Sequence, residues 1–250
     1  MKLLPLLLIL LTAIAPVAAQ DNDKPEKRLQ GWEEDFLNLP EDRRKEFAER
    51  INKARELFGQ KRIFETIEEL KAAEKIFADS PDVENMLGAC QVEFRAFDKA
   101  MEHFDRANSL SPGNASVLFN IAEVHFVTKN WTEAERNFER VLALVEDDEK
   151  QKALYHLTEF KLMLCMIKSG KLDEARKMVG KYDFMVDTPF PFYAEAAIAY
   201  HDGDDLKAEA ALARASRVFR NPQLLAPWHD TLMEFGYIKS FYGGDLIEEE

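Results

Sequence analysis

A pattern of small and bulky apolar residues recurs in this chain at a spacing of 34 residues, and it constrains the fold more than any other feature. The clearest copy spans residues 81–114 and predicts two antiparallel helices joined by a turn. Its defining residues are Leu87, Gly88, Phe97, Ala100, Phe104, Ala107 and Pro112. Leu87 and Gly88 belong to the first helix, and the two alanines with Phe104 belong to the second.

Moving this copy by one period in either direction finds equivalent residues. The three positions of the second helix map to Ala134, Phe138 and Val141 after the copy and to Thr66, Leu70 and Ala73 before it. Two looser copies place Ala175 and Ala208 at the small position, at spacings of 41 and 33 residues. The extra length of the first of these equals about two helical turns, so its first helix, at 147–169, is predicted to be longer.

These residue types have a geometric reason. Two antiparallel helices can approach closely only where a small side chain faces the backbone of the partner helix, and Gly88, Ala100 and Ala134 are expected to supply that gap. Phe104 and Phe138 point into the space between stacked copies, where burying a large apolar side chain stabilises by about 1.5–3 kcal/mol. Because no copy can bury its faces alone, the copies are expected to fold as one array.

The pattern from Pro40 to about Phe219 resembles the tetratricopeptide repeat family. The resemblance is weaker in the last two copies, where Leu162-Met163 and Glu195-Ala196 replace the Leu-Gly pair. It implies an all-α fold, an α-solenoid with a right-handed superhelix, of about five repeats at 40–80, 81–114, 115–148, 149–188 and 189–222. A capping helix at 223–242 and a flexible tail at 243–250 are expected after them. Residues 20–39 are expected to form a polar leader, in which Trp32 and Phe36 can dock.

In this family the first helices line a concave face that receives a segment of a protein partner. Besides Asn85 and Ala89, the matching positions predict partner-binding residues Phe119, Glu123, Phe126, Phe160, Leu164, Ile167, Tyr193 and Tyr200. Such a groove suits an apolar helix or strand, whereas the basic and amide residues with which some members clamp a C-terminal carboxylate are absent. Aromatic residues at helical spacing are more often core, so two alternatives stay open: an open groove, or one covered by the chain's own helices or capping segment.

The first nineteen residues have the composition of a secretory signal peptide. Lys2 precedes an apolar run that ends in Val17-Ala18-Ala19, which predicts cleavage near Ala19 and a periplasmic or secreted product, with an uncleaved anchor as the alternative. No second stretch is long enough to span a membrane. The formal net charge of −13 argues against nucleic acid as a partner, since such a surface repels phosphates.

The sequence lacks the common motifs for catalysis and cofactor binding. The sequence contains no nucleophile elbow, phosphate-binding glycine loop or dinucleotide fingerprint, which predicts no catalytic residue, no cofactor and no small-molecule substrate. The acidic stretch His201-Asp202-Gly203-Asp204-Asp205 is interpreted as a turn rather than a metal site. Cys90 and Cys165 fall two repeats apart, too far for a disulfide, so two buried free thiols are expected.

The sequence therefore predicts a non-catalytic scaffold or adaptor of the cell envelope that binds a protein or peptide partner. One alternative is a structural protein that self-associates through the same apolar groove into a homo-oligomer. Another is an enzyme whose site is assembled from dispersed residues.

Overall fold

The computed structural model describes residues 30–182 and 187–238, and every regular element within them is helical, so the predicted all-α class is confirmed for these residues. The predicted signal peptide, the start of the leader and the predicted tail lie outside them. The elements in chain order are α1 (Gly31–Leu37), α2 (Glu41–Gly59), α3 (Ile63–Glu74), α4 (Pro81–Glu93), α5 (Phe97–Leu110), α6 (Ala115–Val127), α7 (Trp131–Val145), the 3-10 helix η1 (Glu149–Gln151), α8 (Lys152–Lys168), α9 (Leu172–Val179), α10 (Phe190–His201), α11 (Asp205–Val218) and α12 (Pro222–Phe235).

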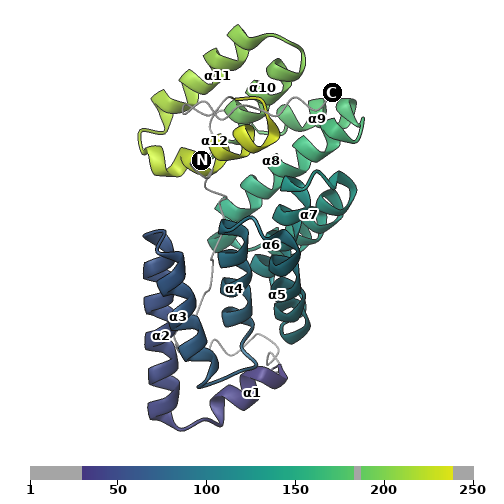
Figure 1. The fold of residues 1–250 in the computed structure, drawn as a ribbon. Helices are drawn as coiled ribbons and strands as arrows, with labels where there is room; N and C mark the ends of the chain where they lie inside the picture. The colour runs from purple at the N-terminus through teal and green to yellow at the C-terminus, as the bar shows by residue number, and fades with distance from the viewer. Residues whose placement is uncertain (1–29, 183–186, 239–250) are drawn as a thin grey trace. The chain divides into compact units, whose positions relative to one another are not determined.

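The chain forms two compact units, and the boundary between them falls inside α6, after Ile121 (Figure 1). The described part of the first unit is 30–121, and that of the second is 122–182 with 187–238. In the first unit α2 packs on α3 and α4 on α5 as neighbouring hairpins. In the second, α8 contacts α7, α9, α10 and α12, while α10 also packs on α11.

The turns of the five helical hairpins share one local geometry. Just after each first helix, one residue adopts a left-handed conformation with φ between 57° and 78°, and these residues are Lys61, Arg95, Lys129, Gly170 and Gly203. In each case the next N–H donates to the carbonyl five residues earlier, at 2.8–2.9 Å, which satisfies a carbonyl that the helix end leaves free. The spacings of 34, 34, 41 and 33 residues equal those of the small residues in the second helices.

The small and bulky positions meet inside the first unit at Gly88 of α4 and Phe104 of α5. A Cβ atom added to Gly88 would lie 2.5 Å from Cε1 and 2.6 Å from Cδ1 of the Phe104 ring. The gap that the glycine leaves is therefore filled by an aromatic ring rather than by the partner backbone. The remaining predicted packing residues, namely Leu87, Ala100, Ala107, Ala134, Phe138, Ala175 and Ala208, are buried, whereas Pro112 is exposed in the turn after α5.

The end of the expected leader is ordered as α1. The ring of Phe36 lies 5.2 Å from that of Phe47 and 5.4 Å from that of Phe77, so an aromatic cluster holds this helix on the first hairpin. Gln30 and Glu33 form a capping box, in which the backbone N–H of Gln30 donates to the Glu33 carboxylate at 2.7 Å. The contacts of Phe36 thus add α1 to the N-terminal end of the helical array.

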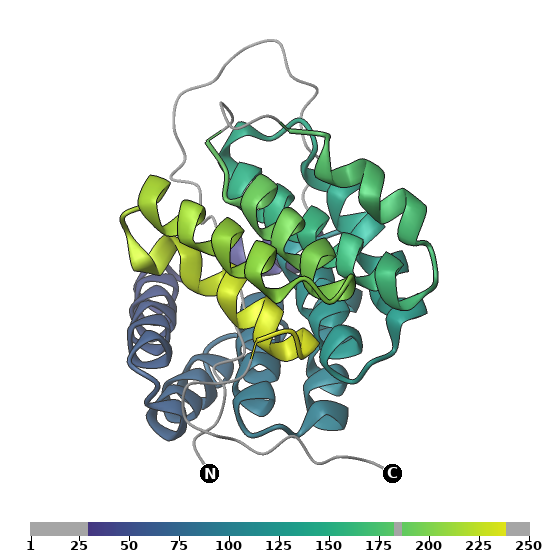
Figure 2. The ribbon, with the colours of Figure 1, turned by 90° about the horizontal axis from the view of Figure 1, so that it is seen from above.

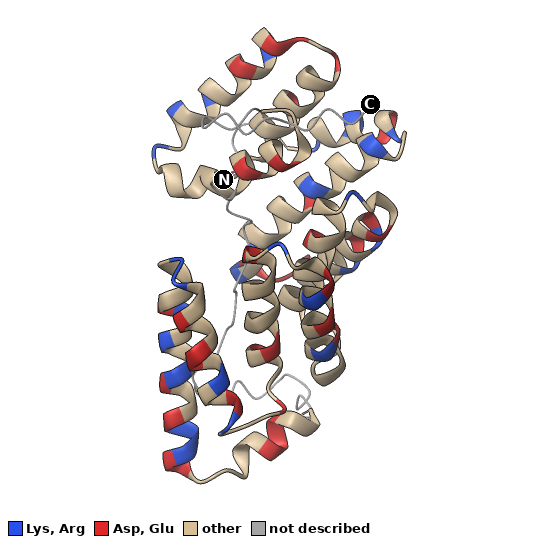
Figure 3. Cartoon of the chain, in the orientation of Figure 1, with Lys and Arg blue, Asp and Glu red and all other residues tan. Residues whose placement is uncertain are grey.

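Charge is unevenly distributed over the helices. Acidic and basic residues alternate along α2, as Figure 3 shows. By contrast, α10 contains Glu195 and no Lys or Arg, and most of its residues are buried. This burial fits a helix with neighbours on nearly every side.

Candidate partner-binding groove

The residues predicted to bind a partner lie on the first helices α6, α8 and α10, but their side chains are not open to solvent. Phe119, at the end of the first unit, is fully buried. In the second unit Tyr200 is partly exposed, and the other six are buried, namely Glu123, Phe126, Phe160, Leu164, Ile167 and Tyr193. Asn85 and Ala89 of α4 are buried as well. Of the two alternatives that the sequence left open, the structure shows a covered face.

The cover over the second unit is α12, which lies across the first helices of three consecutive repeats. The Trp228 ring lies 5.4 Å from Phe160 of α8 and 5.7 Å from Tyr193 of α10. About two helical turns further on, the Phe235 ring stacks 6.1 Å from Phe126 of α6. We call this covered face of α6, α8 and α10 the α12 groove; α12 is the yellow helix in Figure 2.

Local sequence makes α12 an amphipathic helix. Asn221 caps it by accepting a hydrogen bond from the backbone N–H of Gln223 at 3.0 Å, and Pro222 occupies the first helical position, where a missing N–H costs nothing. Gly236 ends it with φ of 89°. The buried anchors have spacings of three, four and three residues, which keep them on one face, and are Leu225, Trp228, Leu232 and Phe235.

A buried ion cluster joins α12 to the floor of the groove. The Lys161 ammonium of α8 lies 3.0 Å from Glu123 Oε2 of α6 and 3.5 Å from Glu234 Oε2 of α12. It also lies 4.7 Å from the centre of the Phe126 ring. All three charged side chains are at most 5% exposed. Because two carboxylates face one ammonium, the cluster has an excess negative charge unless one carboxyl holds a proton.

The pKa of Glu123 is raised to about 7, chiefly by burial; the charge of Lys161 opposes this rise and the charge of Glu234 adds to it. Burial acts to lower the pKa of Lys161, but the two carboxylates outweigh it, so this pKa is raised and the ammonium keeps its charge. The sequence pointed to Glu123 and missed Lys161, although a lysine between Phe160 and Leu162 in an apolar helix was a usable signal.

Comparison with known proteins supports the repeat interpretation. Residues 91–156, from the end of α4 to the start of α8, match a family model described as tetratricopeptide repeat. This segment of the chain therefore contains tetratricopeptide repeats. The predicted α-solenoid is confirmed. Arrays of this kind are protein-interaction scaffolds, and the chain has the fold of this general type. No curated protein matches it.

A solved structure from work on the functional characterisation of Pseudomonas aeruginosa PilF has the same fold. It matches with a TM-score of 0.56 at 15% identity, covering 78% of this chain and 94% of that chain. At this identity the likeness concerns the fold. Within the described residues no helix combines the length and apolar character needed to cross a membrane.

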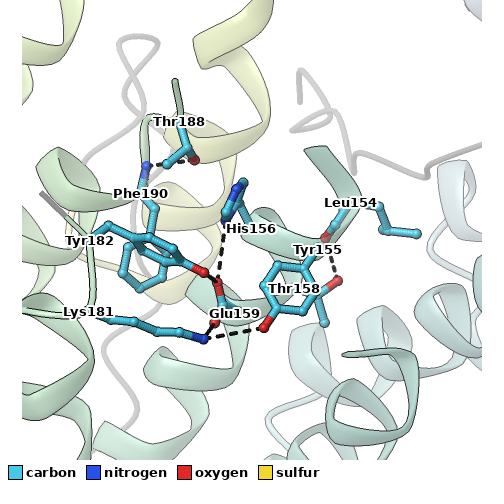
Figure 4. Close-up of polar contacts among 9 residues, drawn as sticks. All are labelled: Leu154, Tyr155, His156, Thr158, Glu159, Lys181, Tyr182, Thr188 and Phe190. Atoms are coloured by element: carbon cyan, nitrogen blue, oxygen red, sulfur yellow. Dashed lines mark hydrogen bonds and ion pairs between the residues drawn. The ribbon is translucent and has the colours of Figure 1, made fainter. Parts of the chain in front are cut away.

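A second buried carboxylate, Glu159 of α8, holds the segment that follows α9 (Figure 4). It accepts a hydrogen bond from the Tyr182 hydroxyl at 2.5 Å, pairs with Lys181 and lies 3.4 Å from Nδ1 of His156. Burial acts to raise the pKa of Glu159, but the three donors outweigh it and the pKa is lowered. With its lone pairs occupied in this way, Glu159 is an anchor for this segment, and no sequence pattern had marked it.

The cysteines and the acidic turn considered for other chemistry have structural roles. Cys90 and Cys165 are free and buried, as predicted, and burial raises the pKa of Cys90 to about 12. In the acidic turn Asp204 caps α11 by accepting from the Lys207 N–H at 3.0 Å, and Asp202 pairs with Arg176. Among the residues that the structure describes, no three His, Cys, Asp or Glu side chains gather as metal ligands.

Proposed function

We propose that this chain is a non-catalytic interaction scaffold of the cell envelope, and that it holds an apolar helical segment of a partner protein in the α12 groove. The observation that carries the proposal is the occupant already there. A helix with anchors on one face fills the groove, so the groove has the width and chemistry that an amphipathic helix requires. The signal-like sequence at residues 1–19 supports the envelope location.

A partner helix must replace α12, because both need the same aromatic side chains. The contacts that α12 makes at Phe160 and Phe126 are ring contacts between buried residues, which a second helix with similar anchors can reproduce. The short connection 219–221 joins α12 to α11, so displacement moves one terminal helix and leaves the hairpins before it in place. We therefore expect α12 to act as a competitor attached to the groove.

The test should change α12 rather than the groove. Alanine at Phe126 or Phe160 would remove core rings at a cost of about 3–5 kcal/mol each, so lost binding could reflect lost structure. Trp228→Ala instead weakens the competitor. We expect the full-length Trp228→Ala chain to retain more partner from its native compartment than the unchanged chain, and an added peptide of residues 221–238 to release that partner.

Leu206→Ala is the matched control, because Leu206 lies on α11 and is 86% exposed. This variant should retain the partner as the unchanged chain does. If no captured protein is released by the peptide, the α12 groove is not the binding site. Amino-terminal sequencing of the product recovered from the cell envelope should begin at Gln20, and a product that begins at Met1 in the cytosol would contradict the location.

Self-association through the same groove is the alternative function. It requires α12 of one copy to enter the groove of another, so the Trp228→Ala variant should lose the oligomer. Sedimentation of the exported chain at tens of micromolar distinguishes the two functions, because a monomer that still captures a partner excludes this alternative.

A further inference from the structure

The floor of the α12 groove contains the buried pair of Lys161 and Glu123, and α12 meets the Lys161 ammonium with a carboxylate. Glu234 lies directly before the last anchor, Phe235, and its Oε2 atom is 3.5 Å from the ammonium. The anchors of α12 are apolar, Thr231 is bonded to its own helix, and the charge of Asp230 acts on Tyr193 of α10. Lys161 is thus the buried cationic partner of one acidic position on α12, Glu234.

A helix without that carboxylate would leave the ammonium poorly satisfied. An ammonium has three N–H donors, and in this site its neighbours are Glu123, Glu234 and the face of the Phe126 ring. Covering Lys161 with an apolar side chain would remove one acceptor and admit no water in its place. Burying a charge with too few partners is costly, so the groove should discriminate against such a ligand.

A second lysine of α8, Lys168, also lies near the end of α12, but it is not buried. Lys168 Nζ lies 4.7 Å from the centre of the Phe235 ring, but its side chain is exposed, so water can satisfy it. Lys168 therefore serves as the matched control for Lys161, because it places a positive charge near α12 that remains exposed to water.

We propose that the α12 groove recognises amphipathic helices with a defined acidic position: apolar or aromatic anchors spaced as Leu225, Trp228, Leu232 and Phe235, and a carboxylate immediately before the last anchor that pairs with Lys161. The proposal rests on the function proposed above and names the class of segment that the partner contributes. The partner is a protein with a helix of this pattern, and the carboxylate is the feature that separates it from other apolar helices.

The experiment uses the full-length chain with Trp228→Ala and Phe235→Ala, which weakens its own α12, and fluorescent peptides of residues 221–238 as probes. The unchanged peptide should bind this chain and not the unchanged chain. The peptide with Glu234→Gln should bind about tenfold more weakly, because the amide keeps an acceptor for the ammonium but loses the negative charge that strengthens the pairing. In a chain that also has Lys161→Met the two peptides should bind equally, whereas Lys168→Met should preserve the difference.

The outcomes separate the two proposals. If both peptides bind the weakened chain equally well while Lys161 is present, the acidic position has no role, and the groove function stands. If neither peptide binds although circular dichroism shows that the chain is helical, the groove does not take a helix in trans and both proposals fail. The peptide comparison does not depend on the folding of Lys161→Met, so it decides the matter even if that variant unfolds.

Discussion

Replacing Gly88 with alanine is the most direct test of the packing that repeats through this array. In most helices this change stabilises, because glycine has more conformational freedom to lose than alanine, and the gain is about 0.5–1 kcal/mol. At Gly88 the added methyl group would lie 2.5 Å from Cε1 and 2.6 Å from Cδ1 of Phe104, closer than carbon atoms can approach. The Phe104 ring is fully buried, so it has no free space to move into.

The two effects can be compared in size. Forcing an extra methyl group into a packed core costs about 1–3 kcal/mol, because side chains must leave their preferred rotamers or helices must separate. This cost exceeds the gain in helix propensity, and we expect Gly88→Ala to destabilise the chain by about 1–2 kcal/mol. Phe104→Leu should lessen the penalty of Gly88→Ala, since the two side chains compete for one space.

Urea unfolding followed by circular dichroism measures this difference. Gly59→Ala is the control, because Gly59 is exposed at the end of α2 and no atom lies within 4 Å of an added Cβ. The control should be neutral or slightly stabilising. A Gly88→Ala chain as stable as the Gly59→Ala chain would refute the argument that the helices of a repeat approach through the contact between Gly88 and Phe104.

Three further predictions concern buried polar groups. Folding raises the pKa of Glu123 from 4.5 to about 7, so the folded chain binds this proton more tightly than the unfolded chain. The contribution of protonated Glu123 to the free energy of unfolding is therefore complete below pH 4.5 and is lost as the pH rises through 7. The loss is on the order of 3 kcal/mol. Glu123→Gln should flatten the dependence of the unfolding midpoint on pH. Cys90 and Cys165 should resist alkylation by iodoacetamide at pH 8 in the native chain and react in urea, because burial raises both thiol pKa values; rapid native labelling would disprove their burial. Asn85→Ala should destabilise by about 1–3 kcal/mol in urea titration, because it removes the acceptor of the buried Asn120 amide 2.9 Å away, while an exposed change such as Leu206→Ala should have little effect.

The sequence by itself determined the hairpins and their period. Small residues such as Ala100, bulky residues such as Phe104 and the turn after each first helix are local signals, because helix geometry relates residues three and four positions apart. The same reasoning marked Phe126 and Phe160 as members of one helical face. It could not decide whether a partner or the chain itself covers them, because aromatic side chains suit both a groove and a core.

Tertiary structure decided that question. Glu234 contacts Lys161 across 73 residues of sequence and Tyr182 contacts Glu159 across 23, and neither pairing can be recognised from local spacing. A buried charge can be recognised as unusual in a sequence, but its partner is known only once the helices have packed, because its energy depends on distance and on exclusion of water. For the same reason the occupant of the groove, α12, became visible only in the folded chain.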